Sequence, residues 1–390
     1  MRYDACMKNI YRVPAKNKQA KALLGGITPA QFLREYWQKK PLLIRAAMPG
    51  FTGLLSPEEL AGMACEEDVE SRLVTQAKGR WRLEQGPFDE ARFGRLPKKN
   101  WTLLVQNVNH HLQSAADLLR QFNFIPHARL DDLMVSYAPD GGGVGPHFDS
   151  YDVFLLQGQG KRLWRVSEQK ELALVDGAPL RILQDFQTEQ EWLLEPGDML
   201  YLPPKMAHWG IAVGDCMTYS IGFRAPAAQE LVTEFLAYLQ DKCVANGLYG
   251  DPGLELQQHP AKIGSAMIKQ VSEMLNKIQW EKSDVAEFLG QYLSEPKPHV
   301  VFDQLRPISE PVFHSRLEKS GIRLSGKSQM LFHGNQFFIN GEQLAVAETS
   351  CALMQQLADN KFLAAGKFSD KFLLKQCYEW YLAGYVEFPQ

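Results

Sequence analysis

Residues 145–166 read GPHFDSYDVFLLQGQGKRLWRV, and this stretch decides the fold. It places His147 and Asp149 two positions apart at the start of an apolar run, which ends in a glycine turn. Residues two apart on a β-strand project to the same face, roughly 7 Å apart at the backbone, so these two side chains can reach one metal ion. Taken alone, a His-x-Asp pair is a common chance pattern and indicates a metal site only weakly.

A second stretch supplies a third ligand. Residues 195–210 read EPGDMLYLPPKMAHWG, in which Pro-Gly-Asp indicates a turn into an apolar strand, two prolines end that strand, and His208 begins the next. The 58 residues between Asp149 and His208 leave room for the intervening strands of a barrel. Two histidines and one carboxylate with open positions are typical of non-heme Fe(II) sites that use O2. We therefore predict an iron site at His147, Asp149 and His208, against the alternative of a core histidine beside an ordinary turn.

An oxygenase of this type needs an electron source, and 2-oxoglutarate supplies one by chelating the iron. Its far carboxylate then requires a buried cation, and Arg162 can provide two parallel hydrogen bonds. Ser136 and Thr218, on flanking predicted strands, could donate hydroxyl groups to the same carboxylate. Strand alternation places Lys161 and Arg162 on opposite faces, but the residues alone do not decide which of the two points inward.

Outward from these motifs, short β-like runs alternate with turn residues between positions 27 and 228. Many short strands at roughly even spacing favour a sandwich or a barrel. The clearest runs are Leu133–Ala138, Tyr151–Gln157, Arg162–Val166, Glu191–Leu202 and Met217–Phe223.

The flanking parts of the chain have different patterns. Residues 1–26 are a basic extension, since the first 22 contain six Lys or Arg and one Asp. Apolar residues recur at helical spacing within 229–298, and their stripes could pack across a two-fold axis. Residues 299–390 indicate a small α+β unit, with three strands between Gln329 and Val346 joined by turns at Gly334-Asn335 and Asn340-Gly341.

Composition narrows the class of protein. The 390 residues are 45% hydrophobic and 22% charged, and a net charge of −3 gives no general attraction to nucleic acid or anionic membranes. The six cysteines contain no C-x-x-C pair, so neither a disulfide scaffold nor a structural zinc site is expected. No apolar run is long enough to cross a bilayer. These features predict a cytoplasmic protein without a membrane partner.

The stretch from Gly141 to Val166, together with 195–210 and MTYSIGFRAP at 217–226, resembles the bacterial ribosomal oxygenases. These are JmjC-domain proteins related to the eukaryotic nucleolar histidyl hydroxylases, and the resemblance extends over essentially the whole chain. It implies an α+β protein with a double-stranded β-helix (a cupin or JmjC jelly roll) at 27–228, a helical dimerisation domain at 229–298 and a winged-helix-like domain at 299–390.

The resemblance also implies a reaction and its participants. Fe(II), 2-oxoglutarate and O2 would be used by a homodimer to hydroxylate an arginine side chain of large-subunit ribosomal protein sixteen. His147, Asp149 and His208 would ligate the iron, and Arg162 would take the 2-oxoglutarate carboxylate. Many JmjC proteins use Lys for that task, so the Arg marks this branch. An amide side chain is usual in the family at the place of Thr218, where a hydroxyl can still donate.

Two carboxylates are candidates for holding an arginine substrate. Asp140 precedes Gly141-Gly142-Gly143 at the predicted barrel mouth, where it could pair with a guanidinium while the glycines let a substrate backbone approach. The alternative is that Asp140 only serves the turn Pro139-Asp140-Gly141, and the two interpretations weigh about equally. Asp152 is a weaker candidate for the same task.

Two other functions stay open at this point. The protein could be a 2-oxoglutarate oxygenase with a different protein substrate, such as a histidyl hydroxylase, or a cupin-domain ligand sensor that regulates transcription. A DNA-reading winged helix is normally basic, whereas residues 301–390 contain nine Lys or Arg and nine Asp or Glu. Direct DNA binding is therefore not expected.

Overall fold

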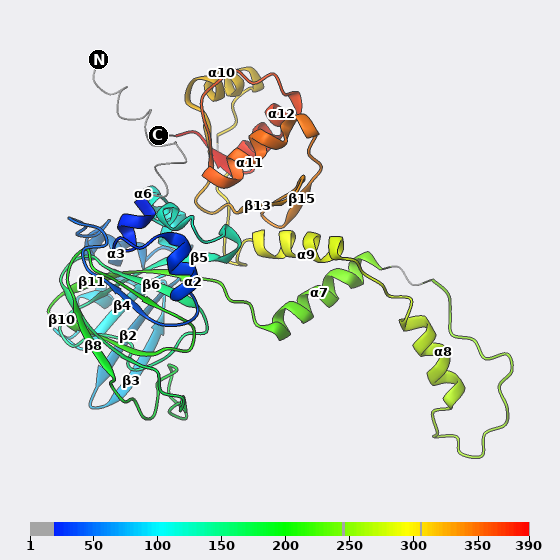
Figure 1. The fold of residues 1–390 in the computed structure, drawn as a ribbon, viewed down its shortest axis with the longest axis horizontal. Helices are drawn as coiled ribbons and strands as arrows, with labels where there is room; N and C mark the ends of the chain where they lie inside the picture. The colour runs from blue at the N-terminus through cyan, green and yellow to red at the C-terminus, as the bar shows by residue number, and fades with distance from the viewer. Residues whose placement is uncertain (1–18, 244–245, 305, 390) are drawn as a thin grey trace. The chain divides into compact units, whose positions relative to one another are not determined.

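The computed structural model describes residues 19–243, 246–304 and 306–389, and Figure 1 shows their fold. The chain divides into two compact units. The barrel unit comprises the described residues up to Ala225 together with 298–303 and 325–327, and the C-terminal unit comprises the described remainder. Residues 1–18 of the predicted basic extension lie outside the described residues. Residues 19–26 are not an extension but part of the barrel unit, because Leu23 and Leu24 pack in its main core.

Two antiparallel sheets form the barrel unit. The larger sheet has the strand order β1-β9-β6-β11-β5-β4-β2-β3, and the smaller has the order β10-β7-β8. The strands are β1 (Leu42–Ile44), β2 (Ser71–Ala77), β3 (Arg80–Gln85), β4 (Trp101–Val105), β5 (Leu130–Ala138), β6 (Asp152–Gln157), β7 (Lys161–Ser167), β8 (Gln190–Leu194), β9 (Met199–Leu202), β10 (Ala207–Val213) and β11 (Cys216–Phe223). Leu155 of β6, Trp164 of β7 and Leu200 of β9 share one buried cluster, so the two sheets face each other. This arrangement confirms the predicted barrel.

Helices cover the other face of the larger sheet. The helices of the barrel unit are α2 (Pro29–Glu35), α3 (Pro57–Met63), α4 (Glu90–Phe93), α5 (Val108–His111), α6 (Gln113–Leu119), η2 (Arg120–Phe122) and η3 (His127–Arg129). Phe32 of α2 and Leu60 of α3 pack with Val135 of β5 in the main core. Because neighbours on a strand point to opposite faces, Ser136 lies on the face toward the smaller sheet, which we call the inner face.

The predicted strands around the motifs are confirmed, with one difference. The run predicted as Glu191–Leu202 is two strands, β8 and β9, because the chain turns at Pro196-Gly197-Asp198. Gly197 has a φ of +88°, and a Cβ added there would lie 2.5 Å from the Met48 carbonyl oxygen, so only glycine suits this turn. Asp198 accepts a hydrogen bond from the Glu195 N–H at 3.1 Å, which closes the turn.

The C-terminal unit contains α7 (Ala228–Lys242), α8 (Ser265–Leu275), α9 (Lys282–Ser294), α10 (Glu310–Ser320), β12 (Ile322–Leu324), β13 (Met330–His333), β14 (Gln336–Ile339), β15 (Glu342–Leu344), η4 (Glu348–Ser350), α11 (Cys351–Asn360), β16 (Phe362–Leu363), α12 (Lys371–Leu382) and β17 (Val386–Glu387). Strands β13, β14 and β15 form the three-stranded sheet that the sequence predicts between Gln329 and Val346. A second sheet, β16-β12-β17, escaped prediction because strands of two or three residues show no periodic pattern.

In the described part of the chain, no helix combines the length and the apolar composition needed to cross a bilayer.

Candidate metal centre

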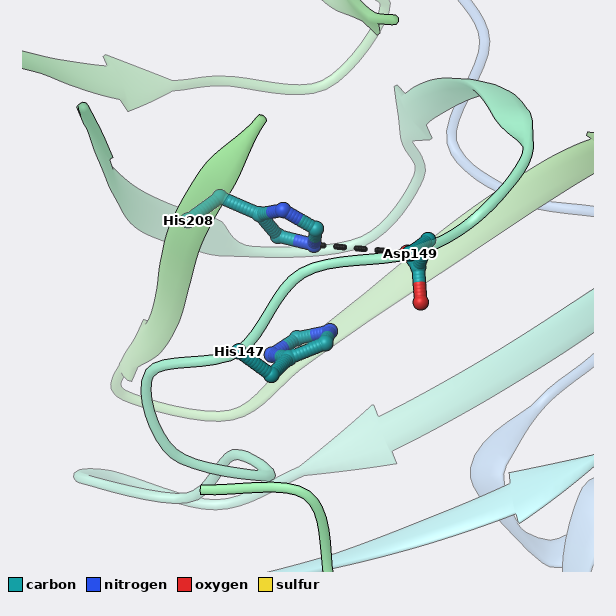
Figure 2. Close-up of side chains that lie close together, drawn as sticks. All are labelled: His147, Asp149 and His208. Carbon is teal, nitrogen blue, oxygen red and sulfur yellow. Dashed lines mark ion pairs between the residues drawn. The ribbon is translucent and has the colours of Figure 1, made fainter. Parts of the chain in front are cut away.

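Three side chains predicted as metal ligands lie close together, as Figure 2 shows. The ligand atoms of His147, Asp149 and His208 all lie within 4.8 Å of one another. Nε2 of His208 is 3.6 Å from an Asp149 carboxylate oxygen, and the two imidazole centroids are 4.2 Å apart. Across the described ranges, no other group of three His, Cys, Asp or Glu side chains is gathered in this way.

The backbone fixes the two histidines relative to each other. The His147 N–H donates to the His208 carbonyl at 2.9 Å, and the His208 N–H donates to the His147 carbonyl at 2.8 Å. This reciprocal pair joins the segment before β6 to the start of β10. Gly145 forms the turn before this pair, with a φ of +80°. A Cβ at this position would lie 2.7 Å from Ile182, so a larger residue does not fit here.

The ring nitrogens are arranged for metal binding. Nδ1 of His147 lies 2.9 Å from the Gly145 carbonyl oxygen, and Nδ1 of His208 lies 2.9 Å from the Met206 carbonyl oxygen. A carbonyl only accepts, so each Nδ1 carries the proton and each Nε2 keeps its lone pair. Burial, and then the neighbouring His147, lowers the pKa of His208 to about 4, so its imidazole is neutral at pH 7. Two imidazole groups and a carboxylate fit Fe(II).

Arg162 settles the choice that the sequence left open. Its side chain is 5% exposed on the inner side of β7, whereas Lys161 points outward and pairs with Glu195 at 2.5 Å. Arg162 Nη1 donates to Ser136 Oγ at 3.4 Å, while its Nε and Nη2 are buried without a partner. These two N–H groups form one edge of the guanidinium, the edge that grips a carboxylate with parallel bonds.

The Thr218 hydroxyl is already hydrogen-bonded to Gln157, a residue to which the sequence analysis assigned no function. Its hydroxyl donates to Gln157 Oε1 at 3.0 Å, and both residues are fully buried. A hydroxyl has one proton, so the expected donation from Thr218 to a cosubstrate carboxylate would require that bond to break. The Gln157 amide also donates to the carbonyls of Gln159 and Gly160, at 3.0 and 3.3 Å. Gln157 therefore holds the turn that leads into Arg162.

Replacing Gln157 with leucine should loosen this turn and weaken 2-oxoglutarate binding about tenfold, because buried carbonyls lose their donor. Calorimetric titration of 2-oxoglutarate into the Mn(II)-loaded protein without O2 measures the effect. Gln159→Leu, an exposed change in the same turn, is the matched control. An unchanged dissociation constant for Gln157→Leu would contradict the assigned task.

Asp140 lies away from the three metal-ligand candidates. Its exposed carboxylate accepts from the Gly214 N–H at 3.1 Å. The chain next to it pairs through Gly142 with Ala212, four residues along β10 from His208, or about 13 Å at strand spacing. The contacts that the structure shows for Asp140 are those of the turn, and its contact with a substrate stays a prediction.

Tyr151, two residues after Asp149, is influenced by several charged residues. Burial raises the pKa of Tyr151, the negative charges of Asp149, Asp132 and Asp131 raise it further, and Arg72 opposes them. Sequence reasoning assigned no function to these neighbours. One signal was available, since Tyr151 lies two residues after Asp149, the spacing that places neighbours on one side of a strand.

Asp152 serves the fold, since its side chain is fully buried and cannot reach a substrate. Its carboxylate accepts from the Tyr201 hydroxyl at 2.6 Å, from Gln38 Nε2 at 3.0 Å and from Arg129 Nη2 at 3.2 Å.

Asp152→Asn should therefore lower the free energy of unfolding by about 3 kcal/mol, because the partly buried Arg129 loses its charged partner and the hydrogen bonds to the buried carboxylate are weakened. Urea unfolding followed by fluorescence checks this, with the exposed Asp176→Asn as the control. Equal stability of the two variants would show that the carboxylate charge is not needed.

Comparisons with known proteins agree with this geometry. Residues 117–231 match the JmjC domain family, and residues 275–387 match the ROXA-like winged helix family. The ribosomal protein uL16 3-hydroxylase of Escherichia coli K12 is 36% identical over 343 residues, which are 87% of this chain and 91% of that protein. A probable ribosomal oxygenase of Haemophilus influenzae is 43% identical over 211 residues, 53% of this chain and 52% of that protein.

A solved structure extends the likeness to three dimensions. The structure of YcfD, a ribosomal oxygenase from Escherichia coli in complex with cobalt and 2-oxoglutarate, superposes with a TM-score of 0.80 at 33% sequence identity. The match covers 93% of this chain and 98% of that one, so it includes both units of the fold.

Proposed function

This chain belongs to the JmjC-domain ribosomal oxygenases, and we propose that it hydroxylates an arginine side chain of ribosomal protein uL16 with Fe(II), 2-oxoglutarate and O2. The observation that carries the proposal is that Arg162 and His208 lie on the inner face of two neighbouring strands. Arg162 pairs with Ala212 on β10, and His208 pairs with Val166 on β7, so both side chains lie on the same face of two adjacent strands. The cation for the far carboxylate of 2-oxoglutarate and one of the metal ligands therefore both point into the barrel.

The residues fit the cofactors that the family name implies. His147, Asp149 and His208 would hold Fe(II), which with 2-oxoglutarate as electron donor supplies oxidation of a C–H bond. Arg162 would bind the far carboxylate through Nε and Nη2. Ser136 would add a hydroxyl donor only where its hydroxyl turns from the Thr218 carbonyl, to which it donates at 3.5 Å. Thr218 would donate to the same carboxylate only if its hydroxyl rotated away from Gln157. The chain contributes binding, orientation and exclusion of water.

The charges at the mouth support an arginine substrate. The negative charges of Asp149, Asp132 and Asp131 all act on Tyr151, and this negative potential favours a cationic side chain over an anionic one. We propose that Asp140, which follows β5 and is exposed, contacts the substrate. A ribosomal substrate supports the proposal that the reaction takes place in the cytoplasm.

Mass spectrometry tests this function. Intact uL16 and its peptides are incubated with the protein, Fe(II), ascorbate and 2-oxoglutarate in air, and the expected result is one added oxygen on a single arginine. The exposed His259→Ala serves as a control that should retain activity. Consumption of 2-oxoglutarate with unmodified uL16 would point to another protein substrate, and no consumption at all would sink the proposed oxygenase.

We also propose that the protein is a homodimer, with α8 in the interface. None of the 11 residues of α8 is buried within the chain, and Ile268 and Leu275 on its apolar stripe are 57% and 60% exposed. A helix this short is marginal in water without packing, so its stripe requires a partner surface. A second copy of the same stripe is self-complementary.

The double substitution Ile268→Glu and Leu275→Glu should convert the dimer to a monomer, because it buries two charges in the apolar contact. Light scattering after size-exclusion chromatography measures the mass. Lys269→Glu, on the polar side of the same helix, should leave the dimer intact. A wild-type protein that elutes as a monomer would refute the proposal.

A further inference from the structure

We infer that Trp164 is a second binding residue for 2-oxoglutarate, whose indole N–H donates to the carboxylate next to the keto group. This role rests on the proposed function and extends it from the cation at the far end of the cosubstrate to the end that chelates the metal. Trp164 lies on β7, two residues after Arg162, and no motif in the sequence assigns it a function.

Trp164 stands between the cation and a metal ligand on the inner face of the smaller sheet. Arg162, Trp164 and Val166 occupy every second position of β7, so their side chains share that face. Val166 is paired with His208 on β10. The Trp164 ring lies 5.8 Å from the His208 ring between centroids, and 5.9 Å from Cζ of Arg162. A cosubstrate that reaches from the guanidinium to the metal therefore passes along the indole.

The facing strand leaves room for this ring. Gly210 of β10 is paired with Trp164, and a Cβ added to it would lie 2.7 Å from Cη2 and Cζ3 of the indole. Glycine within a strand often marks such a close approach, and a larger residue would displace the ring. The ring atoms nearest to Gly210 all belong to the six-membered ring, so Nε1, in the five-membered ring, is not the part that faces β10.

The indole N–H lacks an acceptor. Trp164 is 5% exposed, and its Nε1 is buried with no hydrogen-bond partner among the described residues. The buried side chains that cluster with the ring are apolar, among them Leu155, Leu200 and Leu202 of the larger sheet. An indole nitrogen donates and does not accept, and buried N–H groups are normally paired. Such a donor therefore marks a place where a ligand supplies the acceptor.

The oxygens of 2-oxoglutarate identify that acceptor. Its far carboxylate is the one assigned to Arg162, and the two methylene groups next to it offer no acceptor. At the other end, chelation uses the keto oxygen and one oxygen of the adjacent carboxylate. The second oxygen of that carboxylate has no bond to the metal and is anionic, so an N–H that donates to it forms a charge-assisted hydrogen bond.

Calorimetric titration of 2-oxoglutarate into the Mn(II)-loaded protein without O2 tests this bond. Trp164→benzothienylalanine keeps the shape of the indole but replaces the N–H with sulfur, and it should raise the Kd about tenfold. Trp164→Phe should raise the Kd at least as much. Trp192→Phe removes the indole that is paired with Trp164 on β8, and this packing control should bind 2-oxoglutarate as the wild type does.

The indole proton gives a direct readout of the hydrogen bond. Zn(II) is used in place of Mn(II) for this measurement, because it is diamagnetic. The Trp164 indole resonance is assigned by its absence from the spectrum of Trp164→Phe, and it should move to lower field when 2-oxoglutarate binds.

Two amides of 2-oxoglutarate identify the accepting carboxylate. The amide at the carboxylate next to the keto group replaces the accepting oxygen with a donor, so it should lose more affinity for the wild type than for Trp164→benzothienylalanine. The amide at the far carboxylate should lose the same affinity for both proteins.

Three outcomes would each overturn the inference while 2-oxoglutarate still binds to the wild type. They are an indole proton that does not move, an equal Kd for the wild type and Trp164→benzothienylalanine, and an equal loss of affinity in Trp192→Phe. A wild type that does not bind 2-oxoglutarate at all would overturn the proposed oxygenase as well.

Discussion

Replacing His208 with alanine is expected to lower the rate of uL16 hydroxylation by at least about a thousandfold, because the oxidation depends on a metal that then has two protein ligands. The affinity for Mn(II) or Co(II), measured by calorimetry, should fall in the same variant. The fold should survive, since His208 is neutral at pH 7 and its Nδ1 bonds only a nearby carbonyl.

Two control measurements separate a loss of metal binding from a loss of structure. A melting temperature close to that of the wild type shows that lost activity is not lost structure. The His259→Ala control keeps the count of histidines equal to that of the variant and should bind metal normally. Retention of both metal and activity by His208→Ala would remove His208 from the proposed ligand set.

Replacing Arg162 with methionine is expected to raise the Kd for 2-oxoglutarate about a hundredfold or more, which corresponds to about 3 kcal/mol. Two charge-assisted hydrogen bonds are lost together, and methionine fills much of the same volume. Arg162→Lys should recover only part of the affinity, because an ammonium cannot form the parallel pair. Calorimetry on the Mn(II)-loaded protein gives the values.

Lys161→Met is the matched control on the other face of the same strand. Lys161 is half exposed and pairs with Glu195 at the surface, so its loss should leave the Kd for 2-oxoglutarate unchanged. Equal effects of the two substitutions would mean that the strand, and not the guanidinium, determines binding.

Local patterns predicted the barrel and the convergence of the metal-ligand candidates, because turns and strand alternation are encoded within a few residues. They did not decide between Lys161 and Arg162, since alternation defines two faces and only pairing with β10 and β8 shows which is inside. The bond from Thr218 to Gln157 depends on the register of β11 with β6, which no local pattern contains.

The reciprocal hydrogen bonds between His147 and His208 have an evolutionary consequence. They fix the two ligands to each other directly, so the intervening chain is not needed to set their spacing. The exposed residues 175–177 of the loop between β7 and β8 can therefore change in length and sequence at little entropic cost, whereas Leu183 is bonded through its N–H to the Pro146 carbonyl. Descendants of this chain can acquire new substrates by remodelling that loop while the oxidation chemistry is inherited intact.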